Sequence, residues 1–283
     1  QGMLVTYIPD ALKKGLRLYT NVRAERIEHS VTQAEQVIAQ VWNPKTNRFT
    51  GKTLRIRAKI IVSSAGAING PALFLRSGLN NNGLVGTRTF LHPVIGVSAK
   101  FQNPINGFYG APQSASSHHF INRGRDKIGF FIEAAPTHPM LAATALSVFG
   151  KAQQEFMKDL AHSSFIIALH VDGVLEGDNG GTISLKSDGR IQIDYPISDA
   201  LKEGFLASHQ ALCELALAGG AEQVSTLHPE PLVLSSAQEL SLLSGKTYGA
   251  LEHGIFTAHQ MGGLRLGSDP ATSVVNSNLQ HHQ

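Results

Sequence analysis

The chain has 283 residues, of which 42% are hydrophobic and 16% charged, so it holds enough apolar material for one or two domains with substantial cores. Its net charge of +3 is small for this length and does not indicate a nucleic-acid surface. The loose basic run from Arg48 to Lys59 alternates with apolar residues, as a solvated strand face does. The single cysteine, Cys213, excludes an internal disulfide and a thiolate metal cluster, and its helical surroundings favour a buried, inert thiol.

The two ends of the sequence bear on location and completeness. No apolar run is long enough to span a membrane and no signal peptide opens the sequence, which predicts a cytoplasmic protein. The sequence begins with Gln1 inside a patterned segment, and its last segment, NSNLQHHQ, contains no closing element. We therefore expect the chain to be an incomplete part of a longer polypeptide.

The N-terminal part of the chain indicates one short helix followed by strands. The pattern LVTYIPDAL, from Leu4 to Leu12, predicts a helix that ends near Gly15. Partial or clean alternation then predicts three strands, over 16–29, 36–42 and 53–58, with a turn over 43–52. A mostly apolar run, KIIVS (59–63), is typical of a strand buried in a parallel sheet.

The segment after this run has the layout of a nucleotide-binding α/β layer. KIIVS passes through the small residues of SAGAINGP into the helical sequence ALFLRSGL. Pro71 suits the first turn of this helix and Gly78 suits its end. A buried strand, a small-residue turn and a helix in this order predict one unit of such a layer.

From about residue 91 the pattern changes to that of an antiparallel sheet with helices. HPVIGVSAKF, KIGFFIEAAP and FIIALHV predict strands separated by loops. In TISLKSDGRIQIDYP two alternating strands are joined by Asp188-Gly189, a pair that favours a type I′ turn. A long helix is predicted over Asp199–Ala218, ended by two glycines, and a shorter helical stretch over 237–243. These elements predict a separate α+β unit.

The segment from Phe256 to Leu279, FTAHQMGGLRLGSDPATSVVNSNL, carries the strongest chemical signal. His259 stands on a loop whose glycines allow close approach to a ligand. An imidazole, which titrates near neutral pH, is the usual choice of general base. Taken by itself, a histidine beside two glycines is more often structural, and the sequence contains 13 histidines.

HQMGGLRLGSDPATSVVN resembles the C-terminal motif of the glucose–methanol–choline (GMC) oxidoreductases, H-x-M-G-(T/G)-x-R-M-G-x-D-P followed by S-V-V-D. The matching residues are His259, Met261, Gly262, Gly263, Arg265, Gly267, Asp269, Pro270, Ser273, Val274 and Val275. Leu266 stands where the motif often has Met, and Asn276 replaces the usual Asp. SAGAINGPALFLRSGL (64–79) is similar to the second signature of the family. FLHPVIG and TAHQMGG are similar to its long-chain fatty alcohol oxidase branch.

The resemblance implies an α/β plus α+β fold, in which a partial FAD-binding layer is combined with an antiparallel-sheet substrate domain. It divides the chain into a partial FAD-binding domain (1–90), a substrate-binding domain (91–250) and a return to the FAD domain that carries the histidine motif (251–283). It also implies FAD as the cofactor and a small-molecule alcohol as the substrate. The CH–OH group of that alcohol would be oxidised by proton abstraction and hydride transfer to the flavin.

The same resemblance assigns roles to five residues. His259 is expected to be the catalytic base. Ser64, Ala65 and Gly66 are expected to lie along the nucleotide of FAD, where small side chains let the backbone approach the ligand. Ala24, in the predicted strand TNVRAERI, is expected beside the adenine, and an ordinary strand alanine would explain this position equally well.

The sequence departs from the family pattern in two places. The G-x-G-x-x-G turn that places the FAD pyrophosphate on a helix N-terminus is absent. GDNGG (177–181) precedes a hairpin and not a helix, so it is expected to be a loop. The family's second active-site His or Asn would lie beyond Gln283. We therefore expect the chain by itself to bind FAD weakly and to be inactive.

Two other functions stay open. The first is a sugar or polyol dehydrogenase of the same family, and the second is a non-catalytic ligand-binding or interaction module built on the antiparallel sheet. No metal site is expected, because the neighbours in His118-His119 and His281-His282 would point to opposite faces of a strand. His92 is expected to be a loop contact. The sequence leaves the alcohol, the electron acceptor, membrane association and the oligomeric state unassigned.

Overall fold

The computed structural model describes residues 2–80, 82–111 and 113–282, which form two compact units. Unit 1 contains Gln1–Gly86, Ile183–Gln192 and Gly263–Gln283, and unit 2 contains Thr87–Thr182 and Ile193–Gly262. The segment expected to return to the FAD domain, 251–283, is therefore shared, and its first part, which carries His259, belongs to unit 2. No helix in the described ranges is long and apolar enough to cross a membrane.

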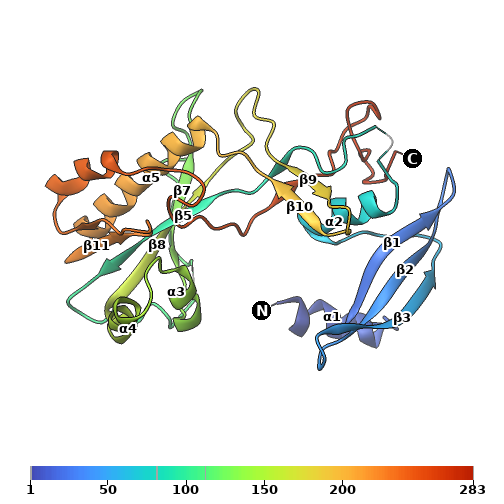
Figure 1. The fold of residues 1–283 in the computed structure, drawn as a ribbon, viewed down its shortest axis with the longest axis horizontal. Coiled ribbons are helices and arrows are strands. Elements are labelled where there is room, and N and C mark those ends of the chain that lie inside the picture. The colour runs from blue at the N-terminus through green and yellow to red at the C-terminus, as the bar shows by residue number, and fades with distance from the viewer. Residues whose placement is uncertain (1, 81, 112, 283) are drawn as a thin grey trace. The chain divides into compact units, whose positions relative to one another are not determined.

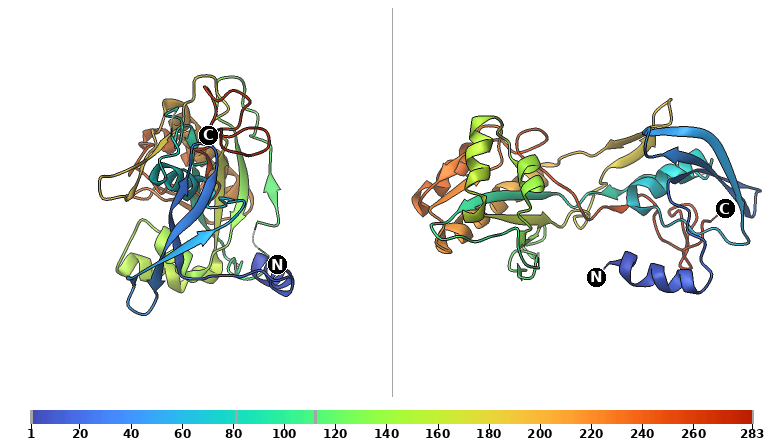
Figure 2. Two further views of the ribbon diagram at one scale, coloured as in Figure 1. Left: turned by 90° about the vertical axis from the view of Figure 1, so that its right-hand side faces the viewer. Right: turned by 90° about the horizontal axis from the view of Figure 1, so that it is seen from below.

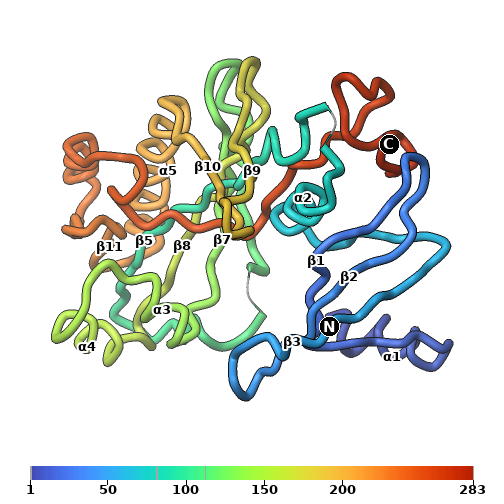
Figure 3. Tube along the Cα trace, turned by 45° about the vertical axis from the view of Figure 1, so that its right-hand side comes forward, coloured from blue at the N-terminus to red at the C-terminus, as the bar shows by residue number. Residues whose placement is uncertain are grey.

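Unit 1 is built on an antiparallel meander. Its elements are η1 (Met3–Val5), α1 (Tyr7–Lys13), β1 (Val22–His29), β2 (Ala34–Asn43), β3 (Arg48–Arg57) and α2 (Gly66–Arg76). The strands pair in chain order, β1-β2-β3 (Figures 2 and 3). Helix α2 is tied to β1 at its C-terminal end, where the Arg76 Nε–H donates to the Glu25 carbonyl at 3.0 Å. The core between them includes Ile27, Leu73 and Phe74.

The structure corrects several expectations for unit 1. The expected strand over 59–63 is wrong, because this segment pairs with no strand in the described residues and leaves Ile60 80% and Val62 79% exposed. An apolar run becomes a buried strand only where neighbouring strands complete its ladder. The expected turn over 43–52 is shorter, because β3 starts at Arg48 and packs Phe49 against Trp42. Pro71 lies inside α2 and not in its first turn.

Unit 2 contains the antiparallel sheet that the sequence predicts. Its strands are β5 (Val94–Lys100), β6 (Ser116–Ser117), β7 (Phe130–Ala135), β8 (Ser163–His170), β11 (Gln223–Thr226) and β12 (Val233–Leu234). They pair in the order β12-β11-β5-β8-β7-β6, and every pair is antiparallel. Its helical elements are α3 (Pro139–Ala145), α4 (Lys151–Lys158), η2 (Leu160–His162), α5 (Asp199–Ala218) and η3 (Ala237–Gly245). The two expectations, an antiparallel sheet and a helix over Asp199–Ala218, are confirmed.

The two faces of this sheet serve different purposes because successive side chains point to opposite sides. On β5, Ile95 and Val97 point into the main core beneath α5, whereas Val94 and Gly96 face the opposite side. Figure 1 shows α5 on one face of the sheet and α3 and α4 on the other.

The start of α5 is stabilised by the Ser198 hydroxyl, which accepts from the Leu201 N–H at 3.2 Å.

The hairpin of β9 (Thr182–Leu185) and β10 (Ile191–Asp194) is present, but its turn differs from the expected type I′. Only Gly189 of the Asp188-Gly189 pair has a positive φ, +80°, and a type I′ turn needs two such residues. The Gly189 N–H donates to the Lys186 carbonyl, and the Lys186 N–H donates to the Arg190 carbonyl. This wider loop lets the Asp188 carboxylate accept from both the backbone and the side chain of Arg190.

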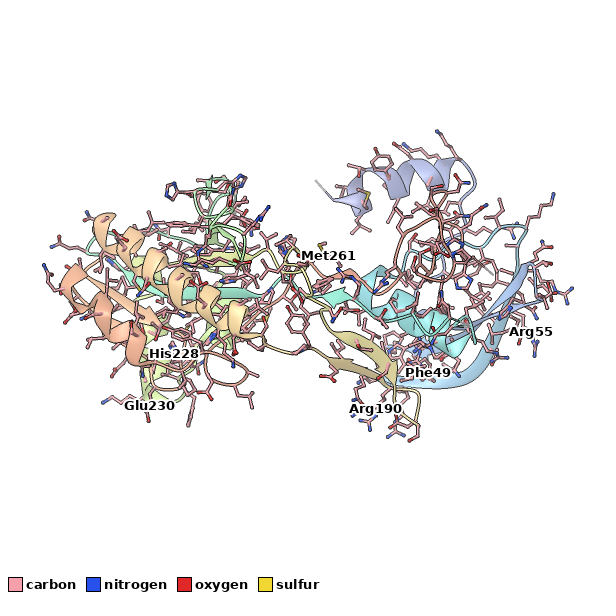
Figure 4. All side chains as sticks on the ribbon, turned by 90° about the horizontal axis from the view of Figure 1, so that it is seen from above. Phe49, Arg55, Arg190, His228, Glu230 and Met261 are labelled. Carbon is pink, nitrogen blue, oxygen red and sulfur yellow. The ribbon has the colours of Figure 1, made fainter. Side chains whose placement is uncertain are left out.

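Four histidines, His170, His209, His228 and His253, are buried in the core beneath α5 (His228 is labelled in Figure 4). The rings of His209, His228 and His253 contact one another with centroids 5.3–5.5 Å apart. Phe205 of α5 touches the rings of both His170 and His253. Burial lowers the pKa of His170 and of His253 to about 4 and that of His209 to about 3, and it also lowers the pKa of His228. These rings are therefore neutral at pH 7.

Candidate functional site

Two segments of unit 2 come together at the motif histidine. Strand β4 (Thr89–Phe90) pairs with β13 (Met261–Gly262), and Val94 exchanges two backbone hydrogen bonds with Phe256, at 2.8 and 2.9 Å. Between these two pairings each segment forms a short loop. The Thr257 hydroxyl donates to the Leu91 carbonyl across the gap. The loops that carry His92 and His259 are therefore fixed against each other.

The rings of His92 and His259 meet edge to face, with centroids 5.9 Å apart and planes at 74°. His92 adopts a φ of +52°, a left-handed conformation that is uncommon for a residue other than glycine. Its N–H donates to Asp172 Oδ1 at 3.2 Å, and its ring Nδ1 lies 3.5 Å from the same oxygen. The other oxygen of Asp172 accepts from the Tyr195 hydroxyl at 2.5 Å. His92, expected to be a simple loop contact, thus joins the motif histidine to a buried carboxylate.

Burial sets the electrostatics of this group. Removal from water raises the pKa of Asp172, and the hydrogen bond from Tyr195 and the nearby His92 oppose that rise. Burial likewise lowers the pKa of His92, against the attraction of the Asp172 carboxylate. The pKa of Tyr195 is raised by burial and by its bond to Asp172, so this hydroxyl keeps its proton and remains a donor. The contact of His92 Nδ1 with Asp172 is longer than a full hydrogen bond and is best described as electrostatic.

His259 borders a cavity of about 370 Å³ on the sheet face opposite α5. The lining comes from β5, β7, β8, α3 and the 256–259 loop and is aliphatic or aromatic over most of its surface; it includes Val94, Leu141, Ala142, Phe165, Ile167 and Leu169. Gln113, Thr137, Thr257 and His259 itself supply the polar groups. The buried Thr137 hydroxyl has no hydrogen-bond partner in the part of the chain that the structure describes. This cavity can take an apolar molecule that carries few polar groups.

The four other predicted site residues lie in unit 1. Ala24 is in β1, pairs with Ala39 and packs against the core, as an ordinary strand alanine does. Ser64, Ala65 and Gly66 are exposed and lead into α2, whose first turn has no side-chain cap and no acidic residue. Gly66 has a φ of +76° with open space where a Cβ would stand. This uncapped helix start with small, exposed residues fits a phosphate-bearing cofactor such as FAD.

The structure also shows where the other candidates from the sequence lie. Cys213 is fully buried in α5, and burial raises the pKa of its thiol to about 12, so it is the inert thiol that was expected. GDNGG is the expected loop. Within the described ranges, no group of three or more His, Cys, Asp or Glu is placed to hold a metal ion. Asp172 and Tyr195 were missed, and neither stands in a sequence pattern that would have found them.

Comparisons with known proteins agree on one family. The amino-terminal model of the GMC oxidoreductases matches residues 1–94, and the carboxy-terminal model matches residues 179–283. An uncharacterized GMC-type oxidoreductase of Mycobacterium tuberculosis is 28% identical over 239 residues, which cover 84% of this chain and 35% of the relative. Long-chain-alcohol oxidase FAO4A of Arabidopsis thaliana is 25% identical over 266 residues, covering 86% and 35%. The chain spans about a third of the length of these relatives.

Among solved structures, a formate oxidase of Aspergillus oryzae RIB40, solved to follow the effect of a mutation on FAD modification, matches with a TM-score of 0.60. The match covers 92% of this chain and 53% of the oxidase at 13% identity, so it bears on the fold alone.

Proposed function

The chain belongs to the GMC oxidoreductase family of FAD-dependent flavoproteins, and we propose that it serves the oxidation of the CH–OH group of an apolar alcohol, with His259 as the base. The observation that carries the proposal is the apolar cavity of about 370 Å³ that His259 borders. A hydrocarbon chain buried there would gain about 25 cal/mol per Å² removed from water. Its hydroxyl would lie at the polar end, beside the imidazole.

Each group of residues has its own role in the proposed reaction. The cavity walls exclude water and hold the carbon chain, which orients the hydroxyl-bearing carbon. Neutral His259 accepts the hydroxyl proton, and the electron pair of the O–H bond forms the carbonyl as the carbon-bound hydrogen leaves with its own pair. A bound FAD would supply the acceptor for that hydride. Ser64, Ala65 and Gly66 would hold part of the nucleotide, with Ala24 as a further contact in unit 1.

The lining of the cavity favours this function over a sugar or polyol dehydrogenase. A sugar brings several hydroxyl groups, and each one buried without a partner costs free energy. Among the residues that the structure describes, only Gln113, Thr137 and Thr257 offer polar side chains in the lining apart from His259. A non-catalytic module would also bind an apolar ligand, and it differs in that substitution of His259 would have no kinetic effect.

Substituting Leu141 by Asp is expected to weaken binding of 1-decanol about 10-fold to 100-fold, because it places a carboxylate in the apolar cavity. Leu141 lines the cavity from α3 and is 47% exposed, so the helix can accept the change. The matched control is Met140→Asp on the same helix, because Met140 is 82% exposed and does not line the cavity. Displacement of a fluorescent apolar probe from the 283-residue chain measures the binding of 1-decanol by both variants. Equal losses in the two variants, or binding of glucose in place of decanol, would refute the proposed substrate class.

A further inference from the structure

His92 stands behind His259 and is not part of the cavity. It touches the His259 ring edge to face at 5.9 Å, yet the cavity lining includes His259 and not His92. The side chain of His92 is only 14% exposed, and its ring also lies beside Phe131 at 6.3 Å. A substrate in the cavity would therefore meet His259 first, and His92 could act only through it.

The support behind His92 is a buried carboxylate that is itself held in place. The Asp172 side chain is 1% exposed and lies against both the backbone N–H and the ring of His92. Tyr195 fixes the second oxygen of this carboxylate. The left-handed backbone of His92, which is unfavourable for a residue other than glycine, shows that its surroundings impose the position of the ring.

Glycines of the GDNGG loop make room for this arrangement. A Cβ at Gly181 would lie 2.5 Å from the Asp194 carbonyl and 2.9 Å from the Tyr195 ring. A Cβ at Gly180 would lie 2.7 Å from the Thr89 carbonyl and also 2.7 Å from the Phe90 ring. All four distances are shorter than real Cβ contacts, so only glycine at these two positions lets the loop pack here. The loop that sequence patterns excluded as a nucleotide site therefore supports the residue that holds Asp172.

We propose that His92, held by Asp172 and Tyr195, is a positioning residue that orients the His259 ring and lets the Asp172 carboxylate stabilise the imidazolium formed there. The proposal rests on the function proposed above. When His259 accepts the substrate proton it gains a positive charge, and a fixed negative charge nearby in a poorly solvated site lowers the energy of that state. The proton stays on His259, because the two rings meet edge to face and no hydrogen bond joins them to carry it to His92.

The test compares Asp172→Asn and His92→Gln with His118→Gln in the chain extended by the family's G-x-G-x-x-G and C-terminal segments and loaded with FAD. His118 is an exposed histidine whose ring also touches Phe131 but is not linked to Asp172. For Asp172→Asn and His92→Gln, kcat for 1-decanol is expected to fall about 10-fold to 100-fold while KM stays within about two-fold, as for other groups that orient a reacting side chain. The His118→Gln variant should match the parent. Tyr195→Phe removes one hydroxyl and serves if a larger change prevents folding.

Tyr195→Phe has an expected pH signature. Its hydrogen bond lowers the pKa of Asp172, so without it the carboxylate loses its charge at a higher pH, and kcat should decline at a higher pH on acidification. A second readout needs no flavin. Ring NMR spectra of the 283-residue chain should show a cross-peak between His92 and His259, and Asp172→Asn should lower the pKa of His92 further.

The outcomes separate the two proposals. Loss of activity in His259→Ala with unchanged kcat in Asp172→Asn, His92→Gln and Tyr195→Phe would overturn the positioning role and leave the base in place. Full activity in His259→Ala would overturn the proposed base. Equal losses in His118→Gln and His92→Gln, or a Tyr195→Phe pH profile that does not move, would also contradict the positioning role.

Discussion

Replacing His259 by alanine, in the chain extended by the family's G-x-G-x-x-G and C-terminal segments and loaded with FAD, is expected to slow flavin reduction by an apolar alcohol. The expected factor is roughly 10²–10⁴-fold, the usual contribution of a positioned general base. The substitution removes the one imidazole that borders the cavity in unit 2, whereas the residues expected to hold FAD lie in unit 1. The cofactor should therefore remain bound. Stopped-flow measurement of flavin bleaching without oxygen gives the rate directly.

A second histidine supplies the control for this experiment. His119→Ala, a change at an exposed histidine beside Phe120, should leave the rate unchanged. Equal rates for the His259 variant and its parent would mean that this histidine has only a structural role.

Unit 2 is expected to lose stability as the pH falls from about 6.5 toward about 4, because its core contains buried neutral histidines. In the unfolded chain these side chains bind protons below their ordinary pKa near 6.5, whereas burial holds the folded pKa of His170 and His253 at about 4. Unfolding therefore takes up protons within this window, and stability is complete only above it. The loss is on the order of 3 kcal/mol for each such histidine.

The chain contains a separate probe for each unit. Cys213, the single cysteine, is buried in α5 of unit 2, so pulse labelling of its thiol in urea reports unfolding there. Trp42, the single tryptophan, packs on Phe49 in unit 1 and reports that unit by fluorescence. Between pH 8 and pH 5 the urea midpoint should fall clearly for Cys213 and much less for Trp42. His209→Leu removes one titrating ring and should reduce the Cys213 shift; an unchanged midpoint in the parent chain would contradict the account.

The parts of the fold that depend on local sequence were predictable. Helix α5 was predicted with its observed bounds because its end is marked by two glycines, and the structure adds Ser198 as the cap of its start. The segment 59–63 was predicted wrongly because its composition describes a strand, while pairing depends on neighbours that no local pattern specifies. The Asp188-Gly189 turn fell between these cases: the hairpin is local, but the side-chain bonds of Asp188 to Arg190 favour another turn.

The residues of the candidate site were also predictable only in part. His259 was found because it opens a long motif. His92 was expected to be a loop contact, because neither the similarity of FLHPVIG to one branch of the family nor the following proline assigns this histidine a role. Asp172 and Tyr195 lie about 80 and about 100 residues from His92. The pairing of β5 with β8 and the bridge between Thr89 and Gly181 bring these distant segments together. A buried carboxylate of this kind is recognised from burial and contacts, which a single sequence does not display.

The most direct test of the central claim is a single turnover without oxygen. The chain extended by the family's G-x-G-x-x-G and C-terminal segments and loaded with FAD is mixed with 1-decanol in one experiment and with glucose in another. The cavity is lined mainly by aliphatic and aromatic side chains, and His259 is the base at its border. The account therefore predicts that 1-decanol removes the absorbance of oxidised flavin and yields the aldehyde, while glucose leaves the absorbance unchanged. Bleaching by glucose with no response to 1-decanol would contradict it.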